Sequence, residues 1–198
     1  MGRPSLANQR TTEILDAFEK CVGRYGLEGS SLERIAEEAG MRRSILRHYV
    51  GNREDLVRAL ADRVVEKYET TLTVHLESQK HRTPLKRLMS YLFPDSFRST
   101  TESLLVIESL IAAAATDDEI QEKMKRYVQH LADRSAVLLR EEFPHAGRQA
   151  CWNVAWGIVS ICFNQESLTP LNLEPRFARA AKKSAMVLIE SLATVEKG

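Results

Sequence analysis

The 198-residue chain lacks several features that whole classes of protein require. Only 7% of its residues are aromatic and nine are glycine, a composition that favours helices over a β-sandwich. No apolar stretch is long enough to span a bilayer, and the N-terminus has no apolar segment typical of a secretory signal. These absences predict a soluble, helical protein without a membrane-spanning segment.

Cysteine is scarce as well. Cys21, Cys151 and Cys162 form an odd set that lacks the C-x-x-C spacing of redox and zinc motifs. Cys151 and Cys162 are about three helical turns apart, so we expect them on one buried face of a helix. The pattern predicts reduced thiols, no metal site and a cytoplasmic location.

The fingerprints of common enzymes are also missing. The sequence contains no HExxH, GxSxG, P-loop or dinucleotide-binding motif. Four of the five histidines are scattered at positions more typical of surface or packing than of metal ligands: His75, His81, His130 and His145. We therefore expect neither an enzyme nor a bound cofactor.

Charge of one sign is in excess only in a single segment. The whole chain has 28 Lys and Arg against 27 Asp and Glu, which argues against a non-specific nucleic-acid binder. Residues 40–53 (GMRRSILRHYVGNR), however, contain four arginines, one histidine and no acidic residue. A short cationic helix after an Ala-Gly step is typical of a helix that lies in the major groove of DNA.

Glycine and proline divide the chain into pieces of helical length. The spacing of apolar residues predicts an all-α fold of about nine helices, with no strand and no internal repeat. The expected helices cover approximately 11–25, 32–39, 42–50, 53–79, 84–93, 101–115, 117–142, 148–166 and 174–195.

Turn and capping signals outline the first two helices. Gly26 is suited to ending the first helix, whose buried face is expected to include Tyr25. Ser30 and Glu33 fit a capping box at the start of the second. Gly40 permits a positive φ angle, so we expect a sharp turn into the third helix.

The third helix has distinct inner and outer faces. Its expected inner residues are Ile45, Leu46 and either Tyr49 or Val50. Its expected outer residues are Arg42, Arg43, Ser44, Arg47 and His48. Beyond Gly51, Asn52 and Asp55 have the spacing to cap the fourth helix.

Two short helices joined by such a turn make a helix-turn-helix, whose second helix offers its first residues to base edges. Arginine is suited to bidentate pairing with guanine, which favours Arg42, Arg43 and Arg47 as base readers. Ser31 and Arg53 lie at helix N-termini, where backbone amides already favour phosphate.

Residues 11–60 resemble the DNA-binding domain of the TetR family of bacterial transcriptional regulators. The matching stretch is ILDAFEKCVGRYGLEGSSLERIAEEAGMRRSILRHYVGNREDL, without a gap. The resemblance implies a DNA-binding domain over residues 1–52 and a ligand-binding and dimerisation domain over residues 53–198. It implies a sequence-specific repressor that a small apolar or amphipathic ligand releases from its operator.

Some positions depart from the family's pattern. Arg47 replaces a tyrosine that commonly touches phosphate, so it can serve a phosphate or a base. Arg53 replaces the usual phosphate-binding lysine, and Arg42 replaces a common serine or threonine, which suggests a distinct operator. The complete set of candidate DNA contacts is Ser31, Arg42, Arg43, Ser44, Arg47, His48, Tyr49 and Arg53.

The second half of the chain is expected to form a large helical core. Residues 103–115 are apolar on most faces, which predicts a buried helix able to line a pocket. Glu102, Glu108 and Ser109 interrupt it, either as a solvent or interface strip, which we favour, or with Glu108 as a buried ligand-binding carboxylate.

Aromatic residues collect on the penultimate expected helix. Trp152, Trp156 and Phe163 are interpreted as core and dimer interface, with pocket lining as the alternative. The resemblance implies that the last two helices pair with their symmetry mates, giving a homodimer. Its recognition helices would lie about 34–36 Å apart on a near-palindromic site.

The expected partners are double-stranded operator DNA, an unidentified small-molecule effector and a second copy of the chain. Helix four is expected to link the effector domain to the DNA. Arg3 lies in a polar arm that either enters a minor groove or remains a disordered tail. A reading from another class is a helical scaffold protein that has lost operator binding.

Overall fold

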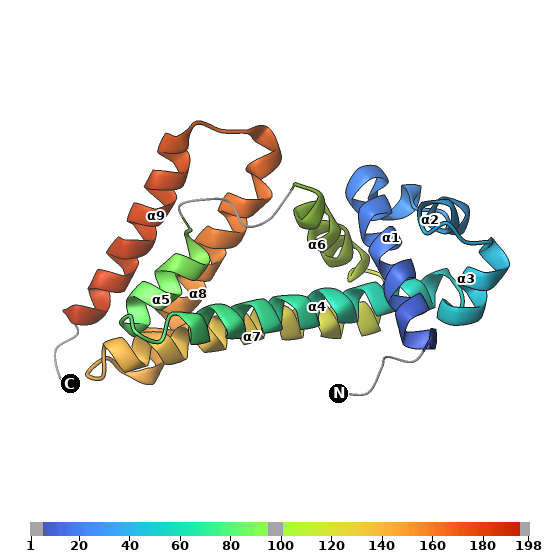
Figure 1. Ribbon diagram of the computed structural model, residues 1–198. Helices are drawn as coiled ribbons and strands as arrows, with labels where there is room; N and C mark the ends of the chain where they lie inside the picture. The colour runs from blue at the N-terminus through green and yellow to red at the C-terminus, as the bar shows by residue number, and fades with distance from the viewer. Residues whose placement is uncertain (1–5, 95–100, 195–198) are drawn as a thin grey trace. The chain divides into compact units, whose positions relative to one another are not determined.

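The computed structural model describes residues 6–94 and 101–194, and these residues form nine α-helices and two short 3₁₀ helices (Figure 1). The all-α prediction is confirmed, and the helix bounds lie close to those expected. Arg3 lies outside the described residues. The α-helices are α1 (Leu6–Gly29), α2 (Leu32–Glu38), α3 (Arg43–Val50), α4 (Arg53–Ser78), α5 (Pro84–Leu92), α6 (Thr101–Ala113), α7 (Asp118–Glu142), α8 (Arg148–Ser167) and α9 (Pro175–Glu190).

The chain separates into two compact units. The first comprises Met1–Glu66 and Ser99–Lys125, and the second comprises Lys67–Arg98 and Arg126–Gly198. Helices α4 and α7 therefore contribute residues to both units. Among the described residues, no helix combines the length and apolar character needed to cross a membrane.

The first unit is organised around α1, which packs against α2, α3 and α6. Its fully buried side chains include Ile14, Phe18, Ile35, Leu46, Leu56 and Leu60. A Cβ atom added at Gly23 would lie 2.7 Å from the Cβ of Glu102. The missing side chain at this position therefore allows α6 to lie directly against α1.

The second unit has its own hydrophobic core, built from α4, α5, α7, α8 and α9. Cys151 and Cys162 are both buried in it, which confirms the shared face expected from their spacing. The core also contains Leu76, Leu88, Leu139, Ile158 and Ile189, all almost fully excluded from solvent.

Several apolar residues lie outside the core, contrary to expectation. Tyr25 is exposed because α1 kinks at Gly26, and its ring lies 4.7 Å from the guanidinium carbon of Arg34. Ile111 is exposed near the end of α6, whereas Val106 and Leu110 are buried, so the predicted burial of that helix is confirmed for part of its surface. Trp152 and Trp156 belong to the surface of α8 rather than to its buried side, since they are 40% and 42% exposed.

Candidate nucleic-acid interface

Helices α2 and α3 form the expected helix-turn-helix in the first unit (Figure 1). The turn between them depends on Gly40, whose φ of 62° is in the left-handed region that glycine tolerates. The amides of Gly40 and Met41 donate to the carbonyls of Glu37 and Ala36, at 3.0 and 2.8 Å. These bonds close the C-terminus of α2. Both amides are therefore paired where the chain turns towards α3.

The serine that caps α2 differs from the predicted one. Ser31 is the N-cap, and its hydroxyl accepts a hydrogen bond from the Arg34 amide at 3.3 Å. Ser30 is instead fully buried and donates to the Gly26 carbonyl at 2.7 Å. The capping box expected from Ser30 and Glu33 is therefore wrong, because Ser31 is the residue that precedes α2 and the Ser30 hydroxyl is bonded to Gly26, where α1 kinks.

Helix α3 buries less of its surface than its sequence suggests. Leu46 is fully buried, while Tyr49 and Val50 are half-buried. Ile45 is 42% exposed, so the prediction that it faces inward is wrong. It adds an apolar side chain to the outer face, one turn before His48. Residues three apart on a helix lie on the same face, so the spacing of Ile45 and His48 could have predicted that both are on the outer face.

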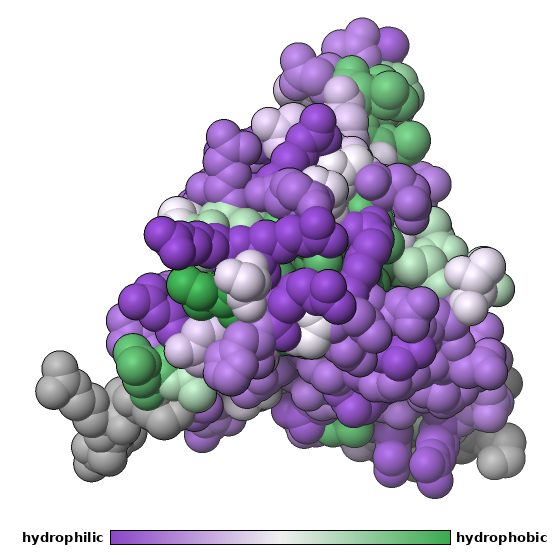
Figure 2. Space-filling model, turned by 90° about the vertical axis from the view of Figure 1, so that its right-hand side faces the viewer, coloured by the Kyte–Doolittle hydropathy of each residue, from purple (hydrophilic) through white to green (hydrophobic). Residues whose placement is uncertain are grey.

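The outer face of α3 carries most of the candidate DNA contacts. Figure 2 shows the side of the molecule on which α3 lies, where hydrophilic residues dominate the visible surface. Five exposed polar side chains follow one another at the start and middle of this region: Arg42, Arg43, Ser44, Arg47 and His48. Tyr49 is half-buried, with its ring edge-on to His48 at 5.2 Å between centroids.

Arg43 has a partner on α2 that the sequence pattern did not predict. Its Nη1 atom lies 2.5 Å from Oε1 of Glu33, and both side chains are more than half exposed. The pKa of Glu33 is lowered, first by a hydrogen bond from its own backbone amide and also by Ser31 and Arg43. An exposed pair of this kind is weak, so Arg43 remains available to a stronger partner.

Arg53 connects the start of α4 to the turn that precedes α2. Its Nη1 and Nη2 groups donate to the carbonyls of Ser30 and Leu27, at 2.6 and 2.5 Å. The sequence predicts a cationic side chain at this position. It does not predict the two hydrogen bonds, because they depend on tertiary packing. Arg53 thereby fixes α4 relative to the helix-turn-helix.

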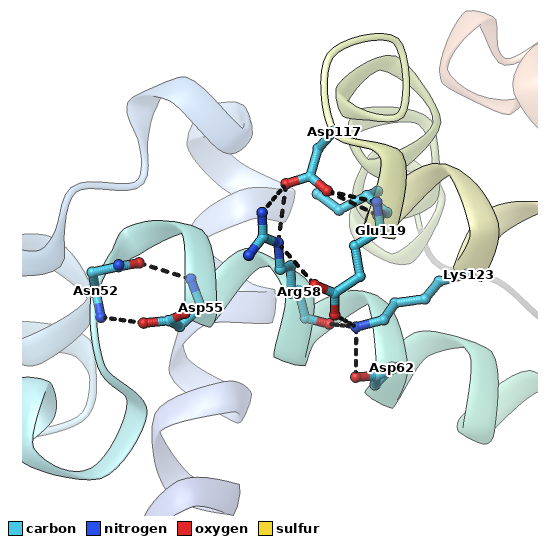
Figure 3. Close-up of polar contacts among 8 residues, drawn as sticks. Asn52, Asp55, Arg58, Asp62, Asp117, Glu119 and Lys123 are labelled. Carbon is cyan, nitrogen blue, oxygen red and sulfur yellow. Dashed lines mark hydrogen bonds and ion pairs between the residues drawn. The ribbon is translucent and has the colours of Figure 1, made fainter.

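The predicted cap of α4 is confirmed. The amide of Asn52 donates to Oδ2 of Asp55 at 3.0 Å, and the amide of Asp55 donates to Oδ1 of Asn52 at 2.9 Å (Figure 3). This reciprocal pair satisfies two otherwise unpaired donors where the chain leaves α3. Gly51, between α3 and this cap, has a φ of 75°.

A second polar cluster in the first unit ties α4 to the start of α7 (Figure 3). Arg58 donates through Nε and Nη2 to Oδ2 of Asp117, at 3.1 and 3.0 Å. The other oxygen of Asp117 accepts from the amides of Glu119 and Ile120, at 3.0 and 3.1 Å. One carboxylate thus caps α7 and pairs with α4.

Lys123 extends the same cluster one turn further along α7. Its ammonium group lies 2.8 Å from Asp62 on α4 and 2.7 Å from Glu119 (Figure 3). Burial lowers the pKa of Lys123, but its bonds to Asp62 and Glu119 outweigh that effect, so the net pKa is raised. We call Arg58, Asp62, Asp117, Glu119 and Lys123 the α4–α7 clamp.

The Arg58–Asp117 pair stabilises the charged form of both groups, and the pKa of Arg58 is raised, first by its hydrogen bond to Asp117. The pKa of Asp117 is lowered below its ordinary value of 3.8, first by the Ile120 amide and then by Arg58. A depressed carboxyl pKa stabilises the fold above the unfolded-state pKa, and this contribution is lost as pH falls through the lower folded-state value. The contribution of Asp117 is therefore lost only as pH falls below the ordinary carboxyl range.

The polar residues expected to interrupt α6 differ in exposure. Glu108 and Ser109 are half-buried, and Glu102 is exposed.

Across residues 6–94 and 101–194, no three His, Cys, Asp or Glu side chains are grouped so as to hold a metal ion.

A family model described as bacterial regulatory proteins, tetR family, matches residues 14–60, which include α2, α3 and the start of α4. The chain is 24% identical over 149 residues to HTH-type transcriptional regulator BetI of Vibrio vulnificus (strain YJ016), covering 72% of this chain and 73% of the relative. Over 49 residues it is 37% identical to HTH-type transcriptional repressor AcnR of Corynebacterium glutamicum, covering 25% and 26% of the two chains.

The fold as a whole resembles solved structures of transcriptional regulators. A regulator from Saccharomonospora viridis, crystallised in complex with choline, superposes with a TM-score of 0.78 at 12% identity. The match covers 92% of this chain and 96% of that one. At this level of identity the comparison shows a common fold.

Proposed function

Because the chain is a DNA-binding transcriptional regulator of the TetR family, we propose that it represses transcription and that a small apolar or amphipathic ligand releases it from a near-palindromic operator. The observation that carries this proposal is the capped helix-turn-helix with a cationic outer face on α3. Repression is supported by the similarity of a 49-residue stretch of the chain to a relative named as a transcriptional repressor.

The exposed start of α3 is the part of the proposed interface that reads bases. Arg42 and Arg43 have the donor geometry for guanine, and Ile45 offers an apolar contact for a thymine methyl group. The remaining proposed contacts are polar or cationic groups that serve phosphates or base edges: Ser31, Ser44, Arg47, His48, Tyr49 and Arg53. Arg53 combines this role with its bonds to the Ser30 and Leu27 carbonyls.

Replacing Arg43 with alanine tests the proposed base reading. We expect the affinity for the preferred operator to fall by about 1–3 kcal/mol and the preference for one base to relax. Binding is measured by fluorescence anisotropy on operator variants across a series of salt concentrations. Arg82→Ala, which removes an exposed arginine of the second unit, is the control and should leave affinity unchanged.

The salt series also distinguishes operator binding from the scaffold alternative. Phosphate contacts release counterions, so operator affinity should fall steeply as salt increases. Binding without dependence on salt or sequence would contradict the proposed function and support a helical scaffold protein.

The apolar surface of α8 and α9 supports a homodimer. Trp152 and Trp156 are one turn apart on α8 and exposed, and Phe177 and Leu188 are exposed on α9. The indole of Trp152 is fixed by a hydrogen bond from Nε1 to Asp133 at 3.1 Å. Exposed large apolar side chains gathered on two helices in contact are typical of a protein interface.

We propose two domains: residues 1–52, which bind DNA together with the adjoining Arg53, and residues 53–198, which otherwise bind the effector and the second subunit. The solved relative of this fold that holds choline supports a small-molecule effector. Because the proposed partner is operator DNA, the proposed location is the cytoplasm.

The α4–α7 clamp provides a route by which an effector alters DNA binding. Effector binding that favours one position of α4 over another shifts the DNA-binding equilibrium by its difference in affinity for the two states. Within the first unit, Arg58 makes the position of α4 depend on the start of α7.

Replacing Arg58 with glutamine should therefore weaken the response to effector more than it weakens operator binding. The measurement is the effector concentration needed for half-release of operator, which we expect to rise in Arg58→Gln. Lys125→Gln removes an exposed cation of α7 that pairs within its own helix, and serves as the control. An unchanged half-release concentration in Arg58→Gln would exclude the clamp from this route.

A further inference from the structure

Glu33 places a negative charge beside the cationic outer face of α3. Its Oε1 atom lies 2.5 Å from Nη1 of Arg43, in an ion pair between two exposed side chains. Glu33 belongs to the first turn of α2, and Arg43 is the first residue of α3. A carboxylate from one helix of the helix-turn-helix is therefore paired with a proposed base reader from the other.

This ion pair distinguishes Arg43 from the neighbouring arginines. Within the described part of the chain, neither Arg42 nor Arg47 forms an ion pair. Helix α2 carries a second exposed carboxylate, Glu37, one turn after Glu33, and it has no ion-pair partner among the described residues either. The contact is therefore particular to Glu33 and Arg43, and is not a general result of the charge in this region.

The carboxylate of Glu33 is stabilised by the start of its own helix. Its pKa is lowered, first by a hydrogen bond from its own backbone amide and also by the Ser31 hydroxyl. Ser31 is in turn held as the N-cap of α2, where it accepts from the Arg34 amide at 3.3 Å. The partner that Arg43 meets is thus an anion fixed at a capped helix end.

The pairing leaves one edge of the Arg43 guanidinium for DNA. A guanidinium presents its donors in a fixed planar fork, so a contact at Nη1 leaves Nε and Nη2 for N7 and O6 of a guanine. A long side chain loses rotamer freedom when it binds. A partner that restricts Arg43 before DNA is bound reduces this loss.

Glu33 also acts on the contact that competes with base reading. Any phosphate attracts an arginine, whatever the DNA sequence. The Glu33 carboxylate repels a phosphate that approaches Arg43, whereas a guanine base carries no net charge to be repelled. The pair is weak in water, but DNA that covers it excludes water and strengthens its electrostatic interactions.

We propose that Glu33 is a positioning residue for operator recognition, which holds Arg43 towards a guanine base and away from phosphate. The inference rests on the proposed function, because it requires Arg43 to read a base of the operator. It goes beyond that function by assigning the selectivity of Arg43 to an acidic residue of α2.

The test compares the wild-type protein with Glu33→Gln, which removes the charge at nearly constant size. Anisotropy gives the affinity for the operator, for unrelated duplex DNA, and for the operator with adenine in place of the guanine whose preference Arg43→Ala relaxes. We expect the preference for guanine to fall about two- to tenfold, as the ordering of one long side chain implies. Affinity for unrelated DNA should rise, and its salt dependence should steepen by at most about one unit.

Two further comparisons separate positioning from a general effect of charge. Glu37→Gln removes the same charge from the same helix and should leave the guanine preference unchanged. In an Arg43→Ala background, Glu33→Gln should have no effect on base preference, because positioning acts through Arg43. Circular dichroism checks that all variants are folded.

An unchanged guanine preference in Glu33→Gln would overturn the proposal, as would an equal loss in Glu37→Gln. A loss of the same size with and without Arg43 would also overturn it, because Glu33 would then read a base directly. So would an Arg43→Ala variant that keeps every base preference.

These outcomes are distinguishable from failure of the proposed function. If Arg43→Ala relaxes the base preference and Glu33→Gln does not, the positioning role is overturned and operator recognition stands. If the wild-type protein has no sequence preference, the positioning role and the proposed function are both overturned.

Discussion

Replacing Trp156 with glutamate should convert the protein from a dimer to a monomer and lower operator affinity by at least about 100-fold. Trp156 is 42% exposed on the apolar surface shared by α8 and α9. Burying an unpaired carboxylate in a subunit interface is strongly unfavourable, so association is lost. A monomer binds DNA through one recognition helix. It therefore lacks the increase in affinity that comes from linking two binding events, which is typically about 10²–10⁴-fold.

Sedimentation velocity gives the oligomeric state, and anisotropy gives the affinity for a full operator and for a half-site. Val74→Glu is the matched control, because Val74 is an exposed apolar residue of the same unit but lies on α4. The control should remain dimeric. A monomeric wild-type protein, or a Trp156→Glu variant that stays dimeric, would show that this surface is not the subunit interface.

Replacing Leu46 with alanine should lower the free energy of unfolding by about 2–5 kcal/mol, because Leu46 is fully buried and its loss leaves a cavity. Leu46 is the buried anchor of α3, so operator binding should be lost along with the packing of the helix. Urea unfolding followed by circular dichroism measures the stability, and anisotropy measures the binding.

The neighbouring residue provides the control for this prediction. Ile45→Ala removes a side chain that is 42% exposed, and its effect on unfolding should stay within about 0.5 kcal/mol. Its effect should instead appear as a weaker preference for thymine at one operator position. Equal destabilisation by the two substitutions would contradict the assignment of the inner and outer faces of α3.

Most of the helix boundaries could be predicted because they depend on neighbouring residues. Gly26, Gly40 and Gly51 all have positive φ angles. Glycine adopts such angles readily because it has no side chain, so its position in the sequence is enough to predict a turn there. The reciprocal cap between Asn52 and Asp55 is likewise contained within four residues. Signals of this kind are complete in the sequence, since no distant residue alters them.

Other features depend on how the backbone bends and how the helices pack, and could not be predicted from the spacing of residues. The choice of Ser31 over Ser30 as a cap follows from the carbonyl that the kink at Gly26 offers to Ser30. The bonds of Arg53 to the turn before α2 join residues 23 and 26 positions apart. Apolar residues on an exposed helix face resemble core residues in a sequence, so the exposure of the indoles of α8 could not be predicted.

The central claim is that this chain reads a symmetric DNA sequence with two copies of α3. In vitro selection of bound sequences from a random DNA library tests it most directly. We expect enrichment of an inverted repeat whose half-sites are about 10–10.5 base pairs apart, centre to centre, or a multiple of that spacing. Recovery of an unenriched library, with binding that does not weaken as salt rises, would contradict the account.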